Sequence, residues 1–166
     1  MAMAGTSAKL VIGPGDDAAG WIAGVGTALV STDTLVEGVD FVRDLQSPYE
    51  VGSKAWGSAA SDLAAMGAEV EFGLVAAVLP RGMFLEAVEA IQLGLVEAAA
   101  RDGATLAGGD LSAAPGPLVL TVTVVGSVPD GQPVTISGGR DGDVLVLTGE
   151  LGAAAAALES WRLGDG

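Results

Sequence analysis

At four places in this chain, aspartate follows small residues in a glycine turn or at the expected end of a strand. No Lys or Arg lies within two positions of them, and they occur in Gly15-Asp16-Asp17, Ser31-Thr32-Asp33, Ser61-Asp62 and Gly108-Gly109-Asp110. Carboxylates gathered at one place raise each other's pKa unless a cation lies among them. Oxygen ligands from Asp, hydroxyl and backbone groups suit Mg²⁺ better than a transition metal. The pattern predicts a magnesium site and, because protein-bound magnesium often keeps substrate phosphates as ligands, a nucleotide or other phosphoester substrate.

Each aspartate alone also fits a structural role, because Asp is common in turns and at helix N-caps. Asp62 is the most informative of the four. It stands in the otherwise apolar helical segment Ala59 to Met66, where a charge needs a reason. The structural alternative for Asp62 is capping of the turn from Leu63 to Met66. The four places together favour the metal site.

The absence of certain residue types and motifs excludes several kinds of chemistry. The chain has neither Cys nor His, which excludes disulfides, thiolate zinc sites and a Ser-His-Asp triad. It has no G-x-x-x-x-G-K-[ST] phosphate loop. The segment Leu10 to Ala18 matches G-x-G-x-x-A after a strand, but Asp16 and Asp17 would face the pyrophosphate of a dinucleotide. With 7 Lys and Arg against 21 Asp and Glu, the net charge of −14 excludes nucleic-acid binding through a basic surface.

Hydrophobic periodicity predicts an α+β fold. A chain that is 50% hydrophobic can bury a core. Apolar residues at helical spacing predict helices from Pro48 to Gly67, from Phe84 to Gly103 and from Gly152 to Leu163. We expect a mostly antiparallel sheet with helices on one face and ferredoxin-like βαβ elements. Its expected strands are Leu10 to Ile12, Trp21 to Ile22, Ala28 to Thr32, Phe72 to Leu79, Thr105 to Ala107, Leu118 to Val128 and Val144 to Thr148.

Two of the expected strands indicate a homodimer. Both faces of Leu118 to Val128 and of Leu74 to Leu79 are apolar or carry threonine. A sheet with helices on one face must cover a second apolar face, most economically with another subunit. The first nine residues lack the features of a secretory signal, and no apolar run is long enough to cross a membrane. We therefore expect a cytoplasmic protein without a membrane partner.

Several segments resemble thiamine-monophosphate kinase, in the order in which that family carries them. The Gly-Asp-Asp and Gly-Gly-Asp pieces are shared with aminoimidazole ribonucleotide synthetase, selenophosphate synthetase and the hydrogenase maturation factor HypE. The segments from Asp33 to Phe41 and from Ser61 to Ala68 are more specific to thiamine-monophosphate kinase. The matching segments are Gly13-Pro14-Gly15-Asp16-Asp17-Ala18, Ser31 to Phe41, Lys54-Ala55, Ser61 to Ala68, Gly108-Gly109-Asp110 and Thr148-Gly149.

The resemblance implies a kinase that transfers the γ-phosphoryl group of ATP to thiamine monophosphate and forms thiamine diphosphate. In that family no side chain acts as a nucleophile, and Mg²⁺ ions hold the two phosphate chains in line. By position, Gly109 and Asp110 would bind ATP. Asp40 stands where the family usually has a substrate-contacting histidine, and Ile136 replaces a nucleotide-contacting arginine. The metal ligands would be Asp17, Ser31, Thr32, Asp33, Asp62 and Asp110.

The resemblance also implies an organisation and leaves alternatives. Residues 1–149 would form an N-terminal domain that binds metal and ATP, and residues 150–166 would begin a second domain. The family's dimer joins two N-terminal halves in a β-barrel. One alternative is another ATP-dependent synthetase of the same superfamily. The other is a degenerate, non-catalytic dimerisation domain whose acidic turns are only structural.

Overall fold

The computed structural model describes residues 10–12, 20–21, 27–128, 132–135, 137 and 139–164. The chain forms two compact units, Met1–Val134 and Thr135–Gly166. Unit 2 contains the helix α3 (Ala153–Leu163). Unit 1 contains β1 (Leu10–Ile12), β2 (Gly20–Trp21), β3 (Thr27–Val36), α1 (Pro48–Ala65), β4 (Glu69–Pro80), α2 (Leu85–Arg101), β5 (Thr105–Ala114) and β6 (Val119–Val128).

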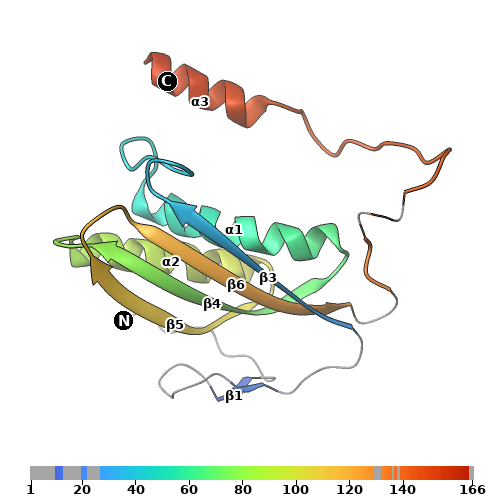
Figure 1. Ribbon diagram of the computed structural model, residues 1–166, viewed down its shortest axis with the longest axis horizontal. Helices are drawn as coiled ribbons and strands as arrows, with labels where there is room; N and C mark the ends of the chain where they lie inside the picture. Colours follow the sequence, from blue (N-terminus) through green and yellow to red (C-terminus); the bar gives the residue numbers. More distant parts are fainter. Residues whose placement is uncertain are drawn as a thin grey trace. The chain divides into compact units, whose positions relative to one another are not determined.

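The main sheet of unit 1 is mixed, with the strand order β3-β6-β4-β5 (Figure 1). β6 pairs antiparallel with both β3 and β4, and β4 pairs parallel with β5. The segment from β4 through α2 to β5 is therefore a β-α-β unit. β3 and β4 also run parallel, with β6 between them, which is a split β-α-β arrangement. The predicted α+β class is confirmed.

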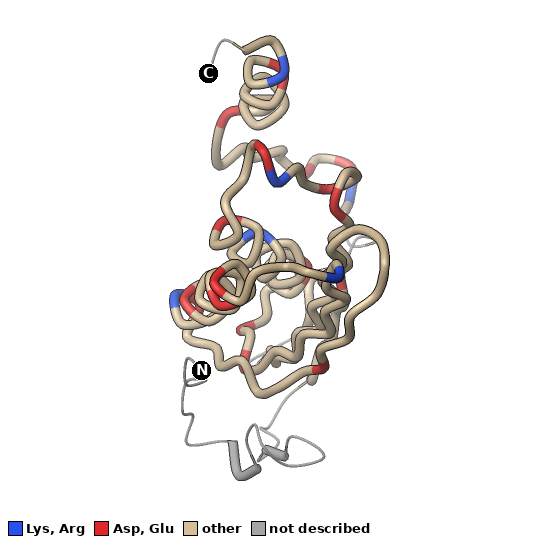
Figure 2. Tube along the Cα trace, turned by 90° about the vertical axis from the view of Figure 1, so that its left-hand side faces the viewer, with Lys and Arg blue, Asp and Glu red and all other residues tan. Residues whose placement is uncertain are grey.

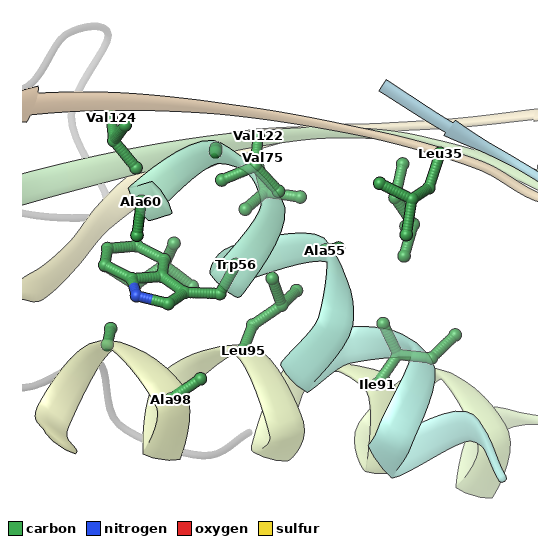
Figure 3. Close-up of a cluster of buried hydrophobic side chains, with 14 of the residues drawn as sticks. Leu35, Ala55, Trp56, Ala60, Val75, Ile91, Leu95, Ala98, Val122 and Val124 are labelled. Atoms are coloured by element: carbon green, nitrogen blue, oxygen red, sulfur yellow. The ribbon is translucent and has the colours of Figure 1, made fainter. Parts of the chain in front are cut away.

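Helices α1 and α2 cover one face of this sheet, and the main core lies between the two layers (Figure 3). Exposure alternates strictly along β6, where Leu120, Val122 and Val124 are buried and the residues between them are half-buried. The alternation follows from the two-residue period of a strand. The second face of the sheet has no helix layer in the described part of unit 1, and we call it the open face.

Local sequence explains where α1 begins and how it is held. Ser47 and Glu50 form a capping box in which the Ser47 Oγ accepts a hydrogen bond from the Glu50 N–H. The hydrogen bonds that Ser47 donates to the Glu50 carboxylate lower the pKa of that carboxyl group. Further along, the buried Trp56 donates from Nε1 to Oδ2 of Asp102 over 2.7 Å and ties α1 to the end of α2.

The structure corrects the expected strand from Val144 to Thr148, which is not a strand. A strand needs hydrogen-bonding neighbours, and the described residues of unit 2 provide none. β5 is longer than predicted and runs on through Gly109 and Asp110 to Ala114. A Cβ on Gly109 would meet the Val75 carbonyl oxygen at 1.9 Å, so glycine allows this strand to lie against β4. In the described residues no helix is long and apolar enough to span a bilayer.

Two glycines bring α1 and α2 into backbone contact. A Cβ added to Gly52 would lie 2.1 Å from the Ile91 carbonyl oxygen, and one added to Gly94 would lie 2.0 Å from the Tyr49 carbonyl oxygen. Both distances are far inside van der Waals contact. The two helices can approach this closely only because neither position carries a side chain.

We predict that Gly94→Ala destabilises unit 1 by about 1–3 kcal/mol, because the added methyl group must push the helices apart. Gly57→Ala is the matched control, because Gly57 also lies in α1 but a Cβ there meets nothing within 4 Å. The control should be neutral or stabilising by up to about 1 kcal/mol, since alanine favours a helix over glycine. Urea denaturation of the three proteins measures both effects, and equal stability of Gly94→Ala and the parent would contradict the close contact.

Candidate functional site

The structure brings Ser31 and Asp62 together at the boundary between the sheet and α1. The Ser31 hydroxyl donates a hydrogen bond to Oδ2 of Asp62 over 2.5 Å. Asp33 lies two residues further along β3, on the same face of the strand, and is half-buried. Leu35, the next residue on that face, is buried in the core. Two carboxylates and a hydroxyl group are thus held beside the core by β3 and the last turns of α1.

Thr32 points to the open face, because neighbouring residues of a strand alternate between faces. Its hydroxyl lies 2.9 Å from that of Thr123, and Thr34 makes the same kind of contact with Thr121 over 3.0 Å. The predicted metal ligands on β3 are therefore divided. The side chains of Ser31 and Asp33 face the helix layer, and that of Thr32 faces away from it.

Asp110 lies on the opposite side of the sheet from Asp33. In the register of the sheet Asp110 is the partner of Ala76, and Ala76 is the partner of Thr121. This row of residues points to the open face, and Asp110 is exposed there. Gly109 is the partner of Val75, which faces the helices. The two predicted ATP-binding residues are therefore neighbours on β5 that face opposite sides of the sheet.

The donor set suits a hard cation, although the described residues do not form a complete metal site. Asp33, Asp62 and Ser31 offer only oxygen donors, as Mg²⁺ prefers. Among the residues that the structure describes, no three carboxylates lie close enough together to hold a metal ion. Asp17, the remaining predicted carboxylate ligand, lies outside the described residues, as does Ile136. The metal-binding roles remain predictions.

Asp40, the predicted substrate-binding residue, stabilises the turn after β3 in which it lies. Its Oδ2 accepts a hydrogen bond from the Val36 N–H over 2.8 Å, and its carbonyl oxygen accepts one from the Lys54 ammonium group of α1. The turn that follows β3 is therefore fixed at both its carboxylate and its backbone. The Lys54 ammonium group therefore lies beside Asp40, where it could also donate a charged hydrogen bond to a phosphate group.

Glu37 locks the same turn to the sheet. Its backbone N–H donates to the Leu118 carbonyl oxygen, and its Oε2 accepts from the Leu118 N–H, both over 2.9 Å. Its Oε1 pairs with Nε of Arg43 over 2.5 Å. Burial alone would raise the pKa of the Glu37 carboxyl, but the Leu118 hydrogen bond and the Arg43 guanidinium outweigh it and hold the pKa below its ordinary value.

A cavity of about 280 Å³ lies beside Gly109 and Asp110, between α2 and the sheet. The sequence pattern does not predict this cavity, because the apolar stripe of α2 indicates only a buried face. Ile91 and Leu95 of that stripe belong to the core and, with Val88, also border this space. The lining is mostly apolar, with one polar side chain from α2, and includes Val75, Ala77, Leu79, Val88, Ile91, Gln92, Leu95, Leu106, Leu111 and Leu120.

A second hollow of about 830 Å³ is open and is lined by both polar and apolar residues. It is bordered by small residues of α1, by the start of β4 and by the end of α2. Two of its carboxylates already have partners, since Asp102 accepts from Trp56 and Glu71 from the Ser127 hydroxyl over 2.7 Å. These hydrogen bonds indicate a structural role for both groups.

The fold is that of an α+β domain with helices on one face of a mixed sheet and aspartates along its strands. The chain belongs to the family of AIR synthase related proteins, whose N-terminal domain matches residues 15–128. The match covers all of α1, α2 and the four-stranded sheet. This domain therefore carries the candidate site.

Relatives within this family are thiamine-monophosphate kinases. That of Mycobacterium tuberculosis is 40% identical over 154 residues, which are 93% of this chain and 46% of the relative. That of Bacillus subtilis is 38% identical over 148 residues, 89% of this chain and 46% of the relative. The chain thus spans about half the length of the curated relatives it matches.

Solved structures show the same fold. The thiamine-monophosphate kinase of Stenotrophomonas maltophilia is 34% identical, with a TM-score of 0.86, and the match covers 95% of this chain and 49% of that one. AaThiL, solved in complex with AMPPCP and TMP, is 31% identical with a TM-score of 0.77 over 82% of this chain and 43% of its own. The hydrogenase maturation protein HypE, at 21% identity and a TM-score of 0.77, shares the fold.

We predict that Glu37→Gln lowers the stability of unit 1 at pH 7 by about 0.5–1.5 kcal/mol, since the ion pair and the charged hydrogen bond are lost. A carboxyl with a lowered pKa stabilises the fold above its unfolded pKa of about 4.3, and this contribution is lost as the pH falls through the folded pKa. The difference between the parent and Glu37→Gln should therefore shrink below about pH 4.3.

Urea titrations at pH 7 and at pH 3 measure this change. Glu89→Gln, on the exposed face of α2, is the matched control and should alter stability little at either pH. A difference between Glu37→Gln and the parent that stays constant from pH 7 to pH 3 would show that the Glu37 charge does not fasten the turn.

Proposed function

We propose that this chain is the metal- and ATP-binding half of a kinase that transfers the γ-phosphoryl group of ATP to thiamine monophosphate. The observation that carries the proposal is its 40% identity to a thiamine-monophosphate kinase across 93% of the chain. The related AaThiL, in complex with AMPPCP and TMP, supports the choice of substrates. Since ATP is the phosphoryl donor in this reaction, we place the protein in the cytoplasm.

In this proposal the residues of the chain position phosphates and do not react themselves. Asp33, Asp62 and Ser31 would hold Mg²⁺ on the helix-covered side of the sheet, Thr32 and Asp110 would hold Mg²⁺ on the open face, with Asp110 at the ATP side, and Asp17 completes the predicted ligand set. Bound Mg²⁺ would neutralise the charge that develops on the transferred phosphoryl group. The hydrogen bond from Ser31 orients the Asp62 carboxylate before any ligand binds, which reduces the ordering that binding requires.

The surroundings of Gly109 and Asp110 are suited to a nucleotide. Gly109 lets β5 pack against β4 at this point, and the neighbouring Asp110 adds an exposed oxygen donor. The adjoining cavity is apolar and offers the flat base of ATP a place away from water. On the substrate side, Asp40 and Lys54 occupy the turn after β3, where the ammonium group of Lys54 could contact the phosphate of thiamine monophosphate.

We further propose that the open face joins two copies of the chain, as the family's β-barrel does. Two threonine pairs lie on it, and Val30 and Leu74 are 68% and 41% exposed there. The sheet carries few charges, with none on β6, one each on β3 and β5, and two on β4, Glu69 and Glu71, at the start of that strand (Figure 2). Such a face is better covered than left in water. Dimerisation would also place the Asp110 residues of both copies against the interface.

We predict that the chain binds Mg²⁺ together with AMPPCP, and that Asp62→Asn or Asp33→Asn weakens this binding at least about tenfold, because each removes a charged ligand. Isothermal titration calorimetry measures the affinities. Asp44→Asn is the matched control, since Asp44 is an exposed carboxylate in the loop before α1 and is outside the predicted ligand set.

Unchanged binding in Asp62→Asn and Asp33→Asn would contradict the metal site and favour a structural role for the acidic turns. The substrate is tested separately by ADP release with thiamine monophosphate and with other phosphate acceptors. We expect slow release that depends on thiamine monophosphate, because the chain matches only half of its relatives. Faster release with another acceptor would reassign the substrate.

We predict that Val30→Arg raises the dissociation constant of the dimer at least about tenfold, because a charge would be buried in the interface. Val30 is exposed on an edge strand, so the variant should remain folded, which circular dichroism can verify. Leu85→Arg, on an exposed leucine of α2, is the control. Sedimentation equilibrium measures the dimer, and a monomeric parent protein would contradict the proposal.

A further inference from the structure

The cavity of about 280 Å³ between α2 and the sheet has the size and lining of a site for one flat ring system. Small-molecule sites usually have about 300–1,000 Å³, so this volume suits a nucleobase and leaves the rest of a nucleotide outside. Aliphatic side chains of α2, β4, β5 and β6 form its walls and can contact both faces of a planar ring. Leu111, at the β5 border, is 67% exposed, so solvent reaches the cavity on that side and a bound ring would cover this leucine.

A β-bulge in β5 determines which residues of that strand meet the cavity. The register between β4 and β5 moves by one residue after Leu106, so that Ala107 has no partner on β4. Leu106 and Gly109 therefore both lie on the helix-facing side, whereas a regular strand would place Asp110 on that side with Leu106. Asp110 borders the cavity only from the exposed edge. The interior of the cavity consequently favours a neutral ring.

Among the residues that line this cavity, Gln92 of α2 has the only uncharged polar side chain. Its neighbours at i−4 and i+3 on the helix, Val88 and Leu95, border the same cavity, so Gln92 interrupts an apolar stripe. The side chain is half-buried, and no other described residue is hydrogen-bonded to its amide group. The amide is therefore available to a ligand and can turn to present either its oxygen or its nitrogen.

A glutamine amide is complementary to the polar edge of adenine. The amide offers an acceptor and a donor side by side, and adenine presents an amino group beside a ring nitrogen that accepts. Both hydrogen bonds can therefore form at once. A guanine that pairs with the same amide through its oxygen would leave its own amino group against aliphatic side chains without an acceptor. An unpaired buried donor of this kind disfavours the guanine nucleotide.

We propose that Gln92 is the residue that selects adenine over guanine, because its side-chain amide pairs with the edge of the base in the cavity between α2 and β5. This inference rests on the proposed function, since the base that it concerns is that of ATP. The aliphatic walls hold the two faces of the ring, and Gln92 determines which base is accepted. The ribose and phosphates leave the cavity past Gly109 and Asp110, where the metal is proposed to bind.

The test compares two nucleotide analogues on the full 166-residue chain. Isothermal titration calorimetry with Mg²⁺ measures the affinity for AMPPCP and for its guanine counterpart GMPPCP. We expect the parent to bind AMPPCP at least about tenfold more tightly, as a bidentate pair between an amide and a base allows. Gln92→Leu removes both hydrogen bonds and should weaken AMPPCP binding at least about tenfold, so that the ratio of the two affinities falls towards one.

A second variant should reverse the preference. The carboxylate of Gln92→Glu only accepts hydrogen bonds, so it suits the adjacent ring N–H and amino group of guanine and repels the accepting ring nitrogen of adenine. We expect this variant to bind GMPPCP more tightly than AMPPCP. The ratio of the affinities cancels any general effect of the added charge on phosphate binding. Gln46→Leu and Gln46→Glu are the matched controls, because Gln46 is half-buried in the loop before α1 and does not border the cavity.

Equal affinity of the parent for both analogues, or the parental preference in Gln92→Leu or Gln92→Glu, would overturn the role of Gln92 and leave the proposed function in place. If the parent binds neither analogue with Mg²⁺, the proposed function fails, and adenosine alone then tests the cavity by saturation-transfer difference NMR. Adenosine binding that Gln92→Leu abolishes and Gln46→Leu retains would support the role of Gln92. Absence of adenosine binding, or equal binding by both variants, would overturn it.

Discussion

Helices α1 and α2 touch through their backbones at Gly52 and Gly94, where a methyl group would lie about 2 Å from a carbonyl oxygen. This close approach allows both helices to cover the same face of the four-stranded sheet (Figure 1). The close approach also determines where the ends of α1 and α2 lie. α1 brings Asp62 to Ser31 on β3, and α2 leaves an apolar space next to Gly109 and Asp110 on β5. The candidate site therefore depends on a contact that contains none of its residues.

The sheet separates the candidate ligands. Asp33 and Asp62 lie on the helix-covered side, and Asp110 lies on the open face, at the other end of the strand order. Carboxylates that are kept apart in this way repel one another less than a compact cluster would. The fold can consequently hold several acidic groups without a cation already among them. Bound metal ions and phosphates would then bridge these separated carboxylates.

The two long helices were predictable because their apolar residues recur with the helical period, and Gly67 signals the end of the first. The strand Leu118 to Val128 was predictable from its valines and threonines. The full length of β5 was not, because glycine and aspartate disfavour strands, and only its contact with β4 keeps Gly109 and Asp110 extended. The expected strand from Val144 to Thr148 was wrong, because its residues favour a strand but no neighbour pairs with them.

The α+β class, the positions of α1 and α2 and the residue types of the site follow from the amino-acid sequence alone, because periodicity and chemical composition are local properties. The sequence did not determine which side of the sheet each ligand occupies, that Asp40 is engaged with the Val36 N–H, or that Glu37 joins Arg43 to Leu118. These features depend on the pairing register and on residues far apart in the chain. Only the packed tertiary structure decides them, since a shift of register by one residue would move every side chain of a strand to the other face.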